Sequence, residues 1–107
     1  MKLIIAVINH DDTRNVTNSL SKNGIFYTKL STSGGLLRTG NTTLMTIVED
    51  DRVKDVLAIY EEFSHSRKQL VIPAADFSNI FYTGQPVEIS VGGATIAVLD
   101  VEQFYKL

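Results

Sequence analysis

The chain has 107 residues, 44% of them hydrophobic and 21% charged, which is the composition of an ordinary globular protein with room for one core. Ten basic and twelve acidic side chains give a formal charge of −2, which does not favour nucleic acid or an anionic membrane as a partner. The absence of cysteine excludes disulfides and thiolate chemistry, and the apolar run at the start is too short to span a membrane. We expect a single cytoplasmic domain, residues 1–107.

The N-terminal segment predicts a strand followed by a helix. The run from Leu3 to Ile8 is continuous and rich in β-branched residues, which is typical of a central strand covered on both faces. Asp11 or Asp12 then offers a carboxylate that can cap the first turn of a helix. We expect the helix to end at Asn23-Gly24, since glycine is common just past helix ends.

Two further strands and a second helix follow. Strands are predicted for residues 25–30 and 42–48, which are rich in β-branched and aromatic residues. Asp50 or Asp51 is expected to cap the second helix. Its apolar stripe recurs at helical spacing and consists of Val53, Val56, Leu57, Tyr60 and Phe63.

The stretches VINHDDTRNV and TIVEDDRVKDV resemble each other, since each ends a strand and places Asp-Asp at a helix start. This repetition agrees with a strand–helix–strand unit used twice, which gives the ferredoxin-like βαββαβ arrangement of the α+β class. Two helices on one face of such a sheet leave the other face uncovered, although its strands are rich in Leu, Ile and Val. We therefore expect other copies of the chain to bury this face in a closed ring.

The last third of the chain departs from the minimal version of that fold. Residues 69–72 predict a short strand, and residues 73–86 form a long connection with no periodicity that is either a binding segment or a loop pinned by its aromatic residues. The stretch VEISVGGATIAVLDV predicts an extra hairpin that turns at Gly92-Gly93. The final core strand is expected at residues 95–101.

The stretch STSGGLLRTGNTT, residues 31–43, combines a glycine-rich loop with two adjacent leucines. It lacks the residues of a P-loop and the following helix of a dinucleotide fingerprint. Its backbone N–H groups, with Thr28, Arg38 and Asn41 nearby, suit an anion or a nucleotide. The alternative is a flexible hairpin whose leucines pack on an adjoining subunit.

No arrangement of residues predicts catalysis or a metal site. The stretch NHDD, residues 9–12, can be drawn as a metal site or an acid–base pair, but helix capping and a solvated His10 explain it as well. Acylphosphatases of ferredoxin-like fold hold phosphate in the loop after the first strand, and here that loop is acidic. An acylphosphatase-like enzyme therefore remains only a third hypothesis.

The stretches TKLSTSGGLLRTGNTT and VEISVGGATIAVLDVEQF resemble the PII-like cyclic di-AMP receptors of PstA/DarA type, and the similarity covers nearly the whole chain. The resemblance implies a homotrimer of ferredoxin-like subunits without catalytic activity or cofactor. It also implies that cyclic di-AMP binds in clefts between subunits and that the receptor then engages a protein target, which is unknown here. The ligand-binding positions carried over are Phe26, Thr28, Gly35, Leu36, Leu37, Asn41 and Lys106.

The chain departs from the family pattern at three of these positions. Phe26 stands where the receptors have Arg, Leu36 where a Phe stacks on adenine, and Lys106 where a Gln contacts the ligand. Two hypotheses follow: a nucleotide-sensing PII-like signalling protein, or a divergent paralogue that acts as an interaction scaffold and fills the cleft with its own Phe26, Leu36 and Leu37.

Overall fold

The computed structural model of the chain describes residues 1–30, 40–71 and 86–107. The glycine-rich loop up to residue 39 and nearly all of the long connection predicted for residues 73–86 lie outside these ranges. The described residues form the α+β arrangement expected from the sequence, with two helices and antiparallel sheets. The arrangement is consistent with a PII-like fold.

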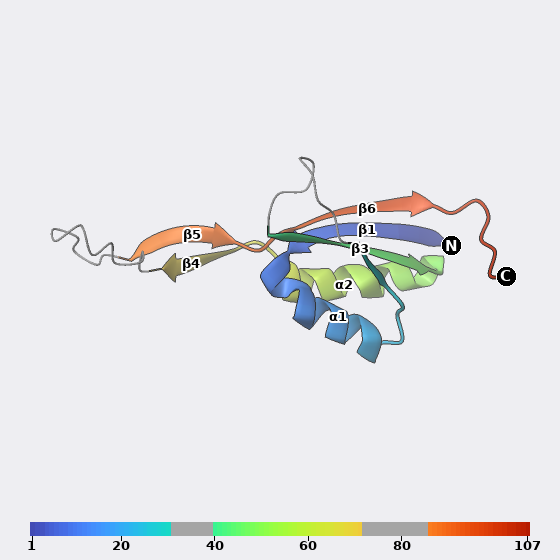
Figure 1. Cartoon of the computed structure of the whole chain (residues 1–107), viewed down its shortest axis with the longest axis horizontal. Helices are drawn as coiled ribbons and strands as arrows, with labels where there is room; N and C mark the ends of the chain where they lie inside the picture. The colour runs from blue at the N-terminus through green and yellow to red at the C-terminus, as the bar shows by residue number, and fades with distance from the viewer. Residues whose placement is uncertain (31–39, 72–85) are drawn as a thin grey trace.

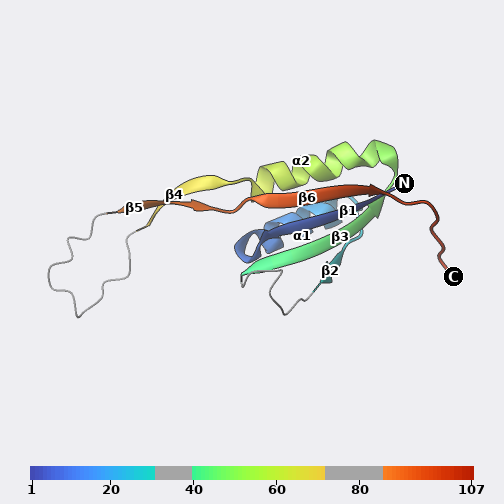
Figure 2. The same cartoon turned by 90° about the horizontal axis from the view of Figure 1, so that it is seen from above.

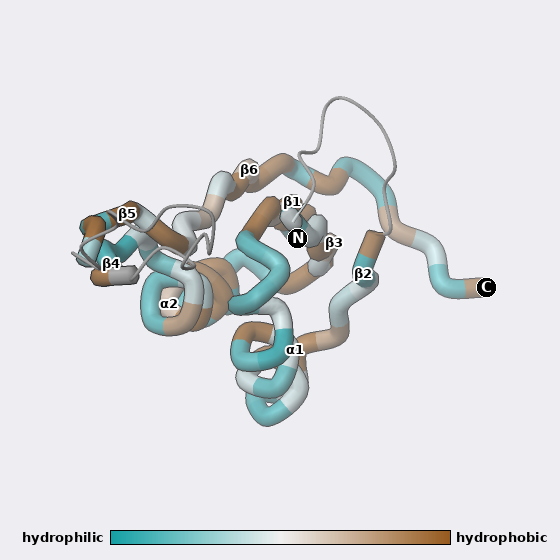
Figure 3. Tube along the Cα trace, turned by 60° about the vertical axis from the view of Figure 1, so that its left-hand side comes forward, coloured by the Kyte–Doolittle hydropathy of each residue, from teal (hydrophilic) through white to brown (hydrophobic). Residues whose placement is uncertain are grey.

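A four-stranded antiparallel sheet forms the body, in the order β2-β3-β1-β6 (Figures 1 and 2). The central position predicted for the first strand is confirmed, because β1 pairs with β3 on one side and with β6 on the other. Both helices lie on the same side of this sheet (Figure 3). The bounds are β1 Lys2–Asn9, α1 Thr13–Lys22, β2 Thr28–Leu30, β3 Asn41–Val48, α2 Val53–Ser64 and β6 Ala94–Asp100.

The chain connects these elements as two interleaved strand–helix–strand units. The strands β1 and β2 flank β3, whereas β3 and β6 flank β1. The two similar sequence stretches occupy equivalent places, because each strand leads through a short 3-10 turn, His10–Asp12 or Asp50–Arg52, into its helix. This order agrees with the repeated unit that the sequence predicts. The predicted strand at residues 25–30 is shorter than expected and begins only at Thr28.

The core lies between the helices and one face of the sheet. In β1 the side chains alternate, so that Ile4, Ala6 and Ile8 are buried under the helices. The helix stripe is confirmed at most positions, but Leu57 is 37% exposed and Ile59 takes its place in the core. The full buried cluster is Ile4, Ala6, Ile8, Val16, Leu20, Ile25, Leu44, Val48, Val56, Ile59 and Tyr60.

The predicted N-cap position is confirmed for the first helix, where Asp12 is the N-cap of α1. No aspartate caps either helix through its side chain, however, and the N-cap of α2 is Arg52. The side chain of Asn9 accepts from the backbone N–H of Asp11 at 2.9 Å and thereby caps the first 3-10 turn. Asp12 makes no side-chain capping bond, and its carboxylate binds an arginine instead. The N-cap of the second turn is Glu49, also without a side-chain bond, while Asp50 accepts from the N-terminal ammonium at 2.6 Å. Acidic residues at these turns therefore make tertiary contacts.

The strands β4 (Arg67–Val71) and β5 (Val87–Val91) form a separate two-stranded sheet that projects beyond the end of the main sheet (Figure 1). We call these two strands the arm. The prediction that Gly92-Gly93 makes a hairpin turn was wrong, because β5 pairs with β4 and β6 pairs with β1. The two glycines, with φ of 75° and 100°, instead form the junction between the arm and the body.

The face of the main sheet away from the helices carries rows of apolar side chains. Directly paired residues share a face, so Ile5 lies beside Met45 on β3 and Ala97 on β6. The next row contains Leu3, flanked by Ile47 and Leu99, which are 40% and 45% exposed. Within the described residues, no helix or strand covers this face. We call it the open face, and it matches the uncovered face that the sequence predicts.

The buried Tyr60 hydroxyl gives a prediction about stability and pH. Tyr60 is 1% exposed, its hydroxyl has no hydrogen-bond partner among the described residues, and burial raises its pKa to about 12. The unfolded chain has an ordinary tyrosine pKa near 10 and releases this proton first as pH rises. Stability therefore falls between pH 10 and about 12, by roughly 2–3 kcal/mol from this group.

We expect Tyr60→Phe to remove this loss and to leave the free energy of unfolding at pH 7 unchanged or higher by about 1 kcal/mol. Denaturant melts of the variant and the wild type at pH 7, 10 and 11.5 measure both effects. The control is Tyr105→Phe, because Tyr105 is 72% exposed and its change should alter neither quantity. A clearly less stable Tyr60→Phe at pH 7 would show that the hydroxyl is hydrogen-bonded.

Candidate functional site

A cleft of about 480 Å³ lies on the open face beside the start of β1. Figure 1 shows this end of β1, marked N, at the opposite end of the sheet from the arm. The walls of the cleft come from the start of β1, the segment that enters β2, the second half of β3 and the C-terminal tail after β6. Most of the lining is apolar or aromatic, with one lysine and one threonine. The lining residues are Met1, Leu3, Phe26, Tyr27, Thr28, Met45, Ile47, Phe104 and Lys106.

Strand pairing and two terminal contacts place these side chains. Thr28 pairs with Met45, which brings the entry of β2 beside the middle of β3. At the other wall, the N–H of Val101 donates to the carbonyl of Met1 at 3.2 Å. This bond holds the start of the C-terminal tail, residues 101–107, beside the start of β1. The ammonium of Met1 also binds Asp50, which lowers the pKa of that carboxyl. Met1 is thereby held between the 3-10 turn that precedes α2 and the start of the tail.

Three of the predicted binding residues, Phe26, Thr28 and Lys106, come together in this cleft. Asn41 is exposed at the opposite end of β3, where it pairs with Asn9, and it does not line the cleft. Gly35, Leu36 and Leu37 lie outside the described residues. The structure therefore brings together the predicted residues at the entry of β2, Phe26 and Thr28, and the predicted residue of the C-terminal tail, Lys106.

Sequence reasoning missed the apolar floor and one aromatic wall of the cleft. Met45 and Ile47 form the floor; alternation along residues 42–48 puts both on one face, and the pairing of Met45 with Thr28 makes it the face of Thr28. Phe104 was recognised only as part of the family resemblance. Nothing in the sequence indicates that the tail returns to β1, because that contact joins the two ends of the chain.

The chemistry of the cleft suits a flat aromatic ligand that carries negative charge. Phe26 is 91% exposed and Phe104 is 52% exposed, so both rings have faces available for stacking. The Lys106 ammonium can bind a phosphate oxygen, and the Thr28 hydroxyl can donate or accept. Apolar walls with a few placed polar groups are typical of small-molecule sites.

The described residues contain no cluster of metal ligands. Among residues 1–30, 40–71 and 86–107, no three His, Asp or Glu side chains gather closely enough to hold a metal ion. His10 places Nδ1 at 3.4 Å from the Thr42 hydroxyl, and Asp12 binds Arg67. In the same part of the chain, neither helix is long and apolar enough to cross a bilayer.

A second cleft, of about 540 Å³, lies between α2 and β6 and includes Tyr60, His65 and Ile96 in its lining. It is slightly larger than the first cleft, but no predicted binding residue lines it. We therefore assign the candidate site to the cleft on the open face, where aromatic rings, a cation and the predicted residues coincide.

Together, the fold and the cleft define a small α+β domain with an apolar cleft on its open face. Comparison with known proteins gives the family: the whole chain, residues 1–107, matches the family described as cyclic-di-AMP receptor. The chain belongs to this family, which confirms the resemblance and indicates a binding and signalling protein rather than an enzyme.

A solved structure supports the fold. The crystal structure of a functionally unknown protein from Pediococcus pentosaceus ATCC 25745 is similar to this chain, with 37% sequence identity and a TM-score of 0.80. The match covers 99% of this chain and 96% of that chain. The α+β arrangement therefore extends to an experimental structure of nearly the same length.

Proposed function

We propose that this protein is a cyclic di-AMP sensor that binds the nucleotide in the cleft of the open face, between subunits of a PII-like homotrimer. The observation that carries the proposal is the cleft itself, which joins Phe26, Thr28 and Lys106 in a chain of the receptor family. The family resemblance also assigns Gly35, Leu36, Leu37 and Asn41 to the ligand, although Asn41 does not line the cleft within the single chain. The signal passes to a protein target that is not identified.

Each side chain of the cleft has a distinct role in this proposal. Phe26 and Phe104 stack on adenine, at about 1–3 kcal/mol for each base–ring contact. Lys106 binds a phosphate of the cyclic dinucleotide through a charge-assisted bond of about 1.5–3 kcal/mol. Thr28 forms a hydrogen bond at the edge of the ligand. Aromatic stacking by Phe26 thus replaces part of what the family's arginine provides at this position.

The open face supports the trimeric part of the proposal. Its rows of Leu, Ile, Met and Ala side chains extend over three strands and reach the cleft. Such a face is stabilised by burial against further copies of the chain, and closed cyclic symmetry leaves none of it exposed. In a trimer, a neighbouring subunit closes the open side of each cleft and encloses the ligand.

Ligand-induced thermal stabilisation of cleft variants tests the roles of these residues. A binding ligand raises the apparent stability by RT ln(1 + [L]/Kd). We expect cyclic di-AMP to raise the melting temperature of the wild type, and Phe26→Ala or Lys106→Ala to reduce that shift, with affinity losses of roughly ten- to a hundredfold. Tyr105→Phe serves as the control, since Tyr105 does not line the cleft.

Equal shifts for wild type, Phe26→Ala and Lys106→Ala would place the ligand elsewhere. No shift in any of them would favour the scaffold hypothesis, in which the chain fills the cleft with its own side chains. The exposure of Phe26 does not favour that alternative, because in the single chain its ring lies almost entirely in solvent.

A further inference from the structure

The outer edge of β6 is the longer of the two edges of the main sheet (Figure 2). β6 has seven residues, whereas β2 at the other edge has three and carries Lys29 at its centre. Proteins usually protect such edges with short strands, lysine or proline, because unpaired backbone groups attract other strands. β6 contains neither lysine nor proline, and within residues 1–30, 40–71 and 86–107 no strand pairs with its outer side.

The strand register shows which backbone groups face this outer edge. Antiparallel strands alternate between pairs that exchange hydrogen bonds and pairs whose N–H and C=O groups point away from each other. Val101 lies opposite Met1 and donates its N–H to the Met1 carbonyl at 3.2 Å. On the other side of β1, the N–H of His10 donates to the carbonyl of Gly40, which lies opposite, at 2.6 Å. Odd-numbered residues of β1 therefore bond to β6, and even-numbered ones bond to β3. The residues of β6 whose N–H and C=O groups point outward are Ala94, Ile96, Val98 and Asp100.

The same residues of β6 border a groove on the helix side of the sheet. The partners of Ile96 and Val98 on β1 are buried under the helices, so both side chains point to that side. Helix α2 does not cover them fully, because Val98 is 42% exposed and Ile96 lines the cleft of about 540 Å³ between α2 and β6. Leu57 on α2 also lines this cleft and is 37% exposed. An apolar groove therefore lies directly beside the unpaired edge.

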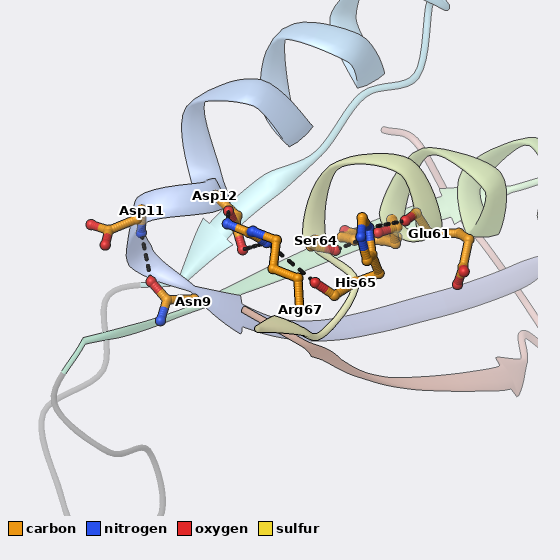
Figure 4. A network of polar contacts seen from close by, with 8 residues as sticks. Asn9, Asp11, Asp12, Glu61, Ser64, His65 and Arg67 are labelled. Atoms are coloured by element: carbon orange, nitrogen blue, oxygen red, sulfur yellow. Dashed lines mark hydrogen bonds and ion pairs between the residues drawn. The ribbon is translucent and has the colours of Figure 1, made fainter. Parts of the chain in front are cut away.

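Polar groups close the groove near the base of the arm. The N–H of Gly93 donates to the carbonyl of Ser64 at 2.8 Å and joins the start of β6 to the end of α2. His65 Nδ1 donates to the carbonyl of Glu61 at 2.9 Å, which holds the imidazole against the last turn of the helix (Figure 4). The exposed Glu61 carboxylate lines the groove and forms no ion pair within the described ranges. The groove thus combines apolar walls with a negative charge at one end.

We propose that the outer edge of β6 binds an extended segment of another protein as an additional strand. Backbone hydrogen bonds to the outward groups of β6 hold the segment, and every second side chain enters the groove against Leu57 and Ile96. The segment carries apolar residues at alternate positions and a Lys or Arg that pairs with Glu61. This inference goes beyond the proposed function, and it holds whether or not the open face binds a nucleotide.

A second copy of the chain fits this edge less well. In the proposed ring, the edges of neighbouring copies that approach each other are β6 of one copy and β2 of the next. β2 has three residues, so it leaves most of the seven-residue edge unpaired. The groove also lies on the opposite side of the sheet from the open face that the ring buries. A segment of a separate protein can pair along the whole strand.

Proline variants test the assignment of the edge. Val98→Pro removes an outward N–H and keeps the bonds between β6 and β1, whereas Leu99→Pro removes an N–H that bonds to β1. We expect Val98→Pro to keep the circular dichroism and the mass of the wild type, and to melt at a clearly higher temperature than Leu99→Pro. Equal melting temperatures would overturn the assignment. A lower mass of Val98→Pro in light scattering would show that this edge joins copies of the chain, and would overturn the choice of partner.

A phage-displayed library of short random peptides tests the kind of segment that binds. Selection on the wild type, with depletion on Leu57→Lys and Val98→Pro, should enrich a defined pattern. We expect Val, Ile, Leu or Phe at every second position, together with a Lys or Arg. Enriched peptides without this alternation would overturn the proposal, and so would the absence of any peptide that distinguishes the wild type from the two variants.

Matched substitutions on α2 measure the contribution of the groove to the affinity of an enriched peptide. Leu57→Lys and Glu61→Lys change residues that line the groove. Their controls are Ala58→Lys and Glu62→Lys, at exposed neighbours outside the lining. In fluorescence anisotropy, we expect the first pair to weaken binding by about tenfold or more and the controls to stay within about twofold of the wild type. Equal affinities in all four variants would place the peptide elsewhere and overturn the proposal.

Discussion

Replacing Phe26 by Arg together with Leu36 by Phe is expected to tighten cyclic di-AMP binding by roughly ten- to a hundredfold or more. The charge-assisted bonds of the arginine, about 1.5–3 kcal/mol, offset the lost stacking of Phe26, and the new ring at position 36 adds about 1–3 kcal/mol of base stacking. Phe26 lines the cleft and is 91% exposed, so an arginine there fits without displacing core residues. Titration calorimetry of the double variant against the wild type measures the gain.

The two single variants are the controls for this prediction. Phe26→Arg exchanges a stacking ring for a forked donor, so its gain should be smaller than that of the double variant. Leu36→Phe alone should strengthen binding by about ten- to a hundredfold. An unchanged Kd in the double variant, with the oligomer intact, would mean that the family's recognition pattern does not apply to this cleft.

Replacing Ala97 by Glu is expected to break the proposed trimer into single chains. Ala97 is exposed in the single chain and lies on the open face midway along the edge strand β6, paired with Ile5 of the central strand. A carboxylate buried there without a partner costs about 3 kcal/mol or more, which weakens association by a factor of at least about 10² per subunit. Size-exclusion chromatography with light scattering measures the mass.

Asn18→Glu provides the matched control, because Asn18 is exposed on α1, on the helix-covered side of the sheet. We expect this variant to keep the wild-type mass, and Ala97→Glu to keep the circular dichroism of a folded chain while losing the trimer. A trimeric Ala97→Glu variant would show that the open face is not the interface. A monomeric wild type at micromolar concentration would contradict the closed ring itself.

Local patterns in the sequence were sufficient to predict the body of the fold. The continuous apolar run of residues 3–8 placed β1 at the centre of the sheet, and the two Asp-Asp stretches marked equivalent turns. The face that a helix or strand buries determines the spacing of its hydrophobic residues, so this spacing can be read from one sequence without knowledge of the tertiary contacts. The exception in α2, where Ile59 and not Leu57 is buried, lies at the edge of its stripe.

Predictions failed where tertiary contacts replaced the local interaction that the sequence suggested. Asp12 has the right position for a helix cap, but a distant arginine, Arg67, takes up its carboxylate. Gly92-Gly93 has the conformational freedom of a hairpin turn, but the strands on either side belong to different sheets. In both cases the deciding partner is far along the chain, and a short sequence window does not contain it.

The candidate site was predicted only in part, because some of its lining residues also depend on contacts between distant parts of the chain. The family resemblance identified Phe26, Thr28 and Lys106, and the structure brings all three together in one cleft. Phe104 and Ile47 entered the site only through the return of the tail to β1 and the register of β3. A register is set by long-range pairing, so those lining residues required the structure.

The most direct test of the central proposal is a calorimetric titration of the purified wild-type protein with cyclic di-AMP, with ATP and cyclic di-GMP as controls. The proposal predicts binding of cyclic di-AMP alone, with a Kd in the micromolar range or tighter and one nucleotide for each chain. Absence of heat with cyclic di-AMP, together with an unchanged melting temperature, would contradict the proposal and leave the cleft without its proposed ligand.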